Sequence, residues 1–144
     1  MTEQGLTYGE QQARRKTFLE AQTSLSGWTI TASLLMYVSV IGIAAAPFVM
    51  LAQTGTWRGF FLLPIAITWL SFCSFWAIGG LLNPGTLVML ALSILLYVSG
   101  QAPTWFNYIL ILYTGAHYIN HHTVEPLKKG VAQLAAQAFP DGVK

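Results

Sequence analysis

The middle of this 144-residue chain almost entirely lacks charge. The sequence contains five Asp and Glu residues and seven Lys and Arg residues, and between Ala21 and Val124 the only one of them is Arg58. An ionised side chain at the centre of a bilayer costs at least ~2.5–3.5 kcal/mol, whereas about a quarter of the residues in a globular domain are charged. The missing charge therefore predicts an integral membrane protein.

Three further features of the sequence narrow the possible functions and processing. The chain has one cysteine, Cys73, so it cannot form an intrachain disulfide. Its net charge of +2 is divided between two ends that each mix both signs, which disfavours nucleic acid as a partner. The first residues are polar and do not form a basic stub followed by a short apolar run, so we expect no removable signal peptide.

Apolar segments fill the charge-poor region and predict an all-α, four-transmembrane-helix bundle. Gly79–Gly80 suits the C-terminus of a helix, and Asn83–Pro84 suits an N-cap followed by proline at the first helical position. The stretch 100–103, Gly-Gln-Ala-Pro, predicts a turn. The predicted helices lie within a transmembrane domain of residues 27–122 and cover about residues 27–53, 59–80, 84–100 and 104–120.

The first predicted helix is longer than a bilayer requires. At 1.5 Å per residue it is ~40 Å long, against a hydrocarbon core of ~30 Å, so we expect tilt or a kink at Pro47. Gly42 and Ala46 have the small-xxx-small spacing that allows another helix to approach closely. A three-span arrangement, in which the second and third segments form a shallow hairpin, is the main alternative.

The basic residues predict that both termini are cytoplasmic. The cluster 14–16, Arg-Arg-Lys, precedes the first predicted helix, and Lys128 and Lys129 follow the last. We expect residues 1–26 and 123–144 to be amphipathic cytoplasmic segments. In the second segment an apolar stripe recurs at offsets of four, three and four residues: Leu127, Val131, Leu134 and Ala138.

Three histidines lie at the end of the last predicted helix, and the chain has no others. His117 and His121 are four residues apart and share a helix face, which Glu125 extends by one turn. The two imidazoles are candidate axial ligands of a haem or a chlorophyll-type pigment, and with Glu125 they could bind zinc or ferrous iron. On the structural interpretation the histidines cap the helix, and Pro126 pushes Glu125 out of helical geometry.

The spacing of these histidines, His117-x-x-x-His121-His122, resembles one histidine box of membrane di-iron desaturases and hydroxylases. That resemblance implies several such boxes, and with no further histidine one chain cannot complete a di-iron site. No nucleophile with an adjacent base is recognisable, and no carboxylate, lysine or arginine lies within a predicted span. The sequence therefore disfavours catalysis, proton-coupled transport and ion conduction.

Aromatic side chains on the second and fourth predicted helices either line a groove for a pigment, quinone or lipid tail, or face lipid. Asn107 and Asn120 are candidates for hydrogen bonds between helices. The aromatic residues are Phe60, Phe61, Trp69, Phe72, Phe75, Trp76, Tyr108, Tyr113 and Tyr118.

We therefore expect a non-enzymatic small subunit of a larger membrane complex, for example an electron-transfer or photosynthetic assembly. Its partners would be membrane lipids and other membrane-protein subunits or copies of itself, and it could contact a haem, a pigment or a lipid. One alternative is a homo-oligomeric carrier or channel for a neutral or apolar solute. The second alternative is a membrane metalloenzyme subunit that uses the histidine cluster.

Overall fold

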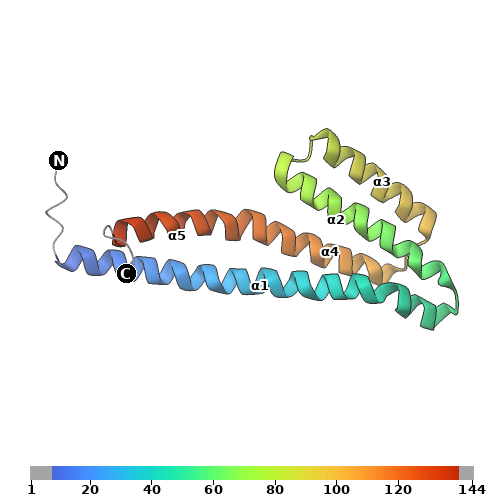
Figure 1. Cartoon of the computed structure of the whole chain (residues 1–144), viewed down its shortest axis with the longest axis horizontal. Helices are drawn as coiled ribbons and strands as arrows, with labels where there is room; N and C mark the ends of the chain where they lie inside the picture. Colours follow the sequence, from blue (N-terminus) through green and yellow to red (C-terminus); the bar gives the residue numbers. More distant parts are fainter. Residues whose placement is uncertain (1–7, 140–144) are drawn as a thin grey trace. The chain divides into compact units, whose positions relative to one another are not determined.

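Every element in the described part of the computed structural model is helical, which confirms the predicted all-α class. The structure describes residues 8–139. Residues 1–7 and 140–144, the outer ends of the two segments expected to be amphipathic, lie outside the described residues. The elements in chain order (Figure 1) are α1 (Tyr8–Thr54), η1 (Trp57–Phe61), α2 (Leu62–Gly79), α3 (Pro84–Gly100), α4 (Thr104–Ile119), η2 (Asn120–Val124) and α5 (Glu125–Ala138). Of the two irregular elements, η1 is a 3₁₀-helix and η2 is a π-helix.

Two helices are long and apolar enough to cross a membrane. One is α1, and the other runs from Trp57 to Gly79 and combines η1 with α2. The helix α3 is apolar but has 17 residues, and α4 has 16. A span needs about 20 residues, with a lower limit near 17. The structure thus provides two of the four predicted spans by length and composition.

The first helix, α1, continues through the boundary that we expected near residue 26. It forms one helix of 47 residues that includes Gly27 and Pro47. Arg, Lys, Glu and Gln are good helix formers, so the polar residues before Gly27 extend the helix instead of ending it. Buried and half-buried side chains recur along α1 at spacings of three and four, which define one covered face. They include Phe18, Ala21, Leu25, Thr29, Ala32, Met36, Ser39, Ile43 and Ala46.

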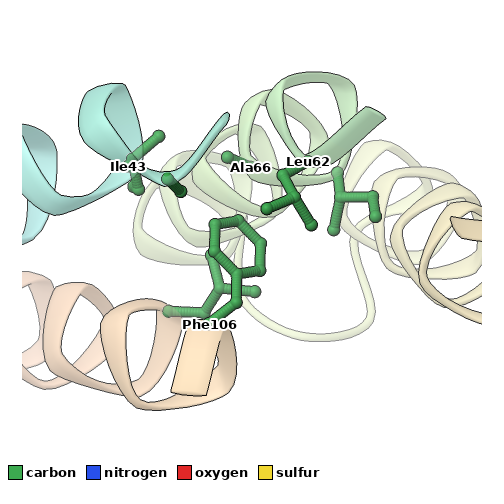
Figure 2. Packing of buried hydrophobic residues seen from close by; sticks show 7 residues of the cluster. Ile43, Leu62, Ala66 and Phe106 are labelled. Atoms are coloured by element: carbon green, nitrogen blue, oxygen red, sulfur yellow. The ribbon is translucent and has the colours of Figure 1, made fainter. Parts of the chain in front are cut away.

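The chain divides into two compact units. We call residues 32–118 the bundle unit, and residues 8–31 with 119–139 the tail unit. In the bundle unit, α2 and α3 pack against each other, and apolar side chains of α1, α2 and α4 form the core. Figure 2 shows the Phe106 ring of α4 directed toward Leu62 of α2, with Ala66 and Ile43 close by. A second core cluster contains Phe72, Cys73 and Tyr113.

Short turns set the ends of α2 and α3, as the sequence predicted. The backbone of Gly80 has a φ of 77°, and its N–H donates to the Trp76 carbonyl at 2.8 Å, which ends α2. The Asn83 side chain accepts a hydrogen bond from the Gly85 N–H at 2.9 Å and caps α3. After α3, Gln101 adopts the left-handed conformation with a φ of 46° and turns the chain toward α4.

In the tail unit, α5 carries the amphipathic stripe that the sequence predicted. The four apolar positions of this stripe are half-buried, whereas Lys128 and Lys129 are exposed. At the end of α5 the ring of Phe139 meets the ring of Phe18 edge to face, with 5.6 Å between centroids. The Arg15 guanidinium lies 5.4 Å above the same ring. The C-terminal end of α5 therefore packs against α1 near Arg15 and Phe18.

Candidate functional site

A cavity of about 370 Å³ lies among α2, α3 and α4 of the bundle unit. Its volume falls within the range of ~300–1,000 Å³ that is typical of small-molecule sites. Most of its lining is hydrocarbon or aromatic, and none of the lining residues carries a charge. We call it the apolar cavity, and its lining residues are Ile65, Trp69, Ser93, Ile94, Tyr97, Asn107, Leu110 and Ile111.

Hydrogen bonds between helices fix two walls of the apolar cavity. The Asn107 side-chain amide donates to the Tyr97 hydroxyl at 3.0 Å, which joins α4 to α3 and confirms the predicted interhelical role of Asn107. The Trp69 indole N–H donates to the Thr114 hydroxyl at 2.9 Å, which joins α2 to α4. A tyrosine hydroxyl that accepts one bond can still donate its own proton. The cavity thus combines a mainly apolar lining with a few polar groups, among them the Tyr97 hydroxyl.

A second cavity, of about 490 Å³, lies between η1 and the turn that joins α3 to α4. Arg58 lines it, and no other residue between Ala21 and Val124 carries a formal charge. Trp57, at the same opening, is 71% exposed. We call it the Arg58 cavity, and its lining residues are Trp57, Arg58, Phe61, Ser99, Gly100 and Gln101.

Two glycines allow the chain to pack closely around the Arg58 cavity. A Cβ atom at Gly59 would lie 2.7 Å from the Met50 Cβ and 2.8 Å from the Pro47 carbonyl oxygen. A Cβ atom at Gly100 would clash with the ring of Phe61 and would lie 2.9 Å from the Ile65 Cδ1. No other residue type fits these contacts without displacing its neighbours.

The three histidines have different surroundings. His117 is half-buried, its ring is nearly parallel to that of Tyr113 with 6.1 Å between centroids, and its Nε2 atom is shielded from solvent. The Nδ1 atom of His121 lies 3.3 Å from the Glu125 Oε2. The side chain of His122 is exposed. Among residues 8–139 no group of three or more His, Cys, Asp or Glu side chains is placed to hold a metal ion. The geometry therefore gives no support to a metal site of His117, His121 and Glu125.

The expectation that Pro126 ends the helix and displaces Glu125 is wrong. Glu125 has helical angles, φ −64° and ψ −45°, and its N–H donates to the Asn120 carbonyl five residues earlier. In an α-helix the Pro126 ring would clash with the carbonyl four residues before it, at His122. The wider π turn accommodates the proline, and the helix continues into α5. The histidines consequently do not cap a free helix end.

The sequence predicted only part of the lining of the two cavities. Of the nine aromatic candidates, Trp69 lines the apolar cavity and Phe61 lines the Arg58 cavity. Tyr108 and Tyr118 are exposed. Sequence reasoning missed Tyr97 and Gly100, although their spacing of three residues places them on one face of α3.

Comparison with known proteins assigns neither a family nor a function to this chain. No protein family, no characterised protein and no solved structure matches this chain. The two cavities and the apolar exterior are accordingly the features on which a functional proposal can be built.

Proposed function

We propose that this chain is a non-enzymatic subunit of a larger membrane protein complex, embedded as a four-helix bundle with both termini in the cytoplasm. The observation that carries the proposal is the apolar exterior of the bundle unit. Large apolar side chains stay exposed on α1, α2, α3 and α4, where water would be an unfavourable solvent and lipid or another membrane helix a favourable one. The most exposed include Tyr37, Ile41, Phe48, Ile67, Ile78, Val98, Tyr108 and Ile111.

The length of the last helix supports a fourth span. The helix does not end with α4, because η2 and α5 continue it. Residues 104–124 contain no Asp, Glu, Lys or Arg, and this uncharged stretch meets the requirement of about 20 residues. The apolar α3, which begins at the Asn83 cap, is at the lower limit of spanning length. Four crossings are thus compatible with the helix lengths.

The extent of α1 supports a role in assembly. A helix of 47 residues is ~70 Å long, more than twice the ~30 Å core of a bilayer. Its N-terminal part carries Arg14, Arg15 and Lys16, which belong in water or at the headgroups. The part of α1 outside the hydrocarbon, with α5 packed on it, offers a surface to a partner subunit.

Purification of the tagged full chain in mild detergent tests this function. We expect one or more polypeptides of different sequence to be recovered in constant ratio to the chain and to resist repeated washing. Recovery of the chain with copies of itself alone contradicts the proposal. That result would support the second candidate, a homo-oligomeric carrier for a neutral or apolar solute, which the uncharged apolar cavity favours.

A further inference from the structure

The apolar cavity and the Arg58 cavity adjoin along one face of the α2–α3 pair. Phe61 and Gly100 line the Arg58 cavity, Ile65 lines the apolar cavity, and Gly100 packs closely against both side chains, so the two cavities are neighbours across this contact. Phe61, Ile65 and Trp69 follow each other at intervals of four residues and therefore share a helical face. The two cavities are therefore neighbours with chemically different linings.

The chemical character of the lining changes in order from the Arg58 cavity to the apolar cavity. Arg58 supplies positive charge at one end, beside the hydroxyl of Ser99 and the amide of Gln101. Tyr97 lies three residues, or ~4.5 Å, before Gly100 at the end of α3, and its hydroxyl accepts the hydrogen bond from Asn107. Beyond this pair, the lining of the apolar cavity is mainly hydrocarbon and indole. The order is therefore the Arg58 cation, the neutral hydrogen-bonded pair of Tyr97 and Asn107, and the apolar part of the cavity.

We infer that the two cavities together bind one anionic glycerophospholipid, an inference that rests on the proposed location in a membrane. The order of groups in such a lipid is a phosphate, ester carbonyls and acyl chains. The Arg58 guanidinium would donate hydrogen bonds to the phosphate, a geometry that arginine provides with two parallel N–H groups. The Tyr97 hydroxyl would donate to an ester carbonyl, and one acyl chain would lie between α2, α3 and α4.

Charge and exposure favour an anionic headgroup over a neutral one. The bundle unit, residues 32–118, contains no carboxylate that could pair with Arg58. The exposed Trp57 next to it is the residue type that occupies the membrane–water interface, where lipid phosphates lie. A lipid phosphate would supply the missing countercharge at the depth where these two side chains are most stable.

Native mass spectrometry of the purified full chain with phosphatidylglycerol or phosphatidylcholine tests the headgroup site. Relative to wild type, Arg58→Gln should reduce retention of phosphatidylglycerol about fivefold, the effect of one cation near an anionic surface. Retention of phosphatidylcholine, which has the same phosphate but a choline cation beside it, should fall less. Lys129→Gln, a matched loss of one positive charge in the tail unit, should leave both lipids at wild-type levels. Equal retention of phosphatidylglycerol by Arg58→Gln and wild type would overturn the inference.

The acyl-chain site requires a second pair of variants. Ile111 lines the apolar cavity and is 64% exposed, and Ile41 on α1 is similarly exposed, at 67%, but lies outside both cavities. Ile111→Trp fills the apolar cavity and should reduce retention of phosphatidylglycerol, whereas Ile41→Trp should not. An equal effect of the two tryptophans would overturn the inference. Displacement of the lipid by millimolar inorganic phosphate would also overturn it, because it would identify a site for free anions.

The lipid-retention experiment and the co-purification experiment test different proposals, so either result can be negative without affecting the other. Lipid retention is measured on the isolated chain, so the absence of a partner polypeptide does not change it. Loss of partners with lipid retention intact would contradict only the proposed subunit function. Recovered partners with no selectivity for phosphatidylglycerol would contradict only the lipid site.

Discussion

Single small residues determine where the helices of the bundle unit approach each other. A Cβ atom at Gly42 of α1 would lie 3.2 Å from the Ile109 Cδ1 of α4, which is tighter than ordinary contact. Gly42→Leu should therefore overpack this contact and lower the free energy of unfolding by about 1–3 kcal/mol. Thermal unfolding in detergent, followed by circular dichroism, measures the change. Gly115→Leu is the matched control, because a Cβ atom at Gly115 meets nothing within 4 Å. Equal midpoints for the two variants would show that Gly42 does not mediate helix packing.

We expect different roles for the individual histidines. We expect His117 to act in packing, since its ring lies parallel to that of Tyr113 and its Nε2 atom is shielded. His117→Ala should destabilise the protein by about 0.5–3 kcal/mol, the common range for point mutations, whereas the exposed His122 should tolerate alanine. Purified protein should show no Soret or red absorption band. A band in the wild type that disappears in His117→Ala would instead establish His117 as an axial ligand of a haem or pigment.

At the scale of elements, the contact between α5 and α1 depends on aromatic rings. Phe18 and Phe139 meet edge to face, and such pairs contribute about 0.5–1.5 kcal/mol beyond the area they bury. Phe18→Ala should speed amide hydrogen exchange throughout α5. Leu19→Ala is the control, because the neighbouring Leu19 side chain is 59% exposed. Exchange in α5 that is equally fast in both variants would contradict the docking of α5 through Phe18.

Element ends were predictable where one residue type has a strong backbone preference. Gly80 and Asn83 set the turn between α2 and α3 through their own conformation and side-chain hydrogen bond, so the sequence alone indicated both. The π turn before Pro126 was not predictable in this way. Proline usually ends a helix, and only the hydrogen bond from the Glu125 N–H to the Asn120 carbonyl shows how the chain accommodates it.

For the whole molecule, the distribution of charge along the sequence predicted the helical fold class, whereas side-chain chemistry did not predict the two cavities. The near absence of charge between residues 21 and 124 indicated a membrane environment and predicted helices throughout. The cavities could not be predicted, because their walls come from different helices whose relative rotation the sequence does not specify. The positions of Arg58 and Tyr97 relative to the apolar cavity depend on this packing.

Cysteine labelling is the most direct measurement of the proposed topology, in which four spans place both termini in the cytoplasm. Single cysteines replace Thr56, Leu82 or Lys129 in a Cys73→Ala background, and Cys73 itself is fully buried. An impermeant maleimide is applied from each side of the membrane. We predict labelling at Leu82→Cys and Lys129→Cys from the cytoplasmic side and at Thr56→Cys from the opposite side. Labelling at Thr56→Cys and Lys129→Cys from the same side, or at Leu82→Cys from neither side, would contradict the four-span arrangement.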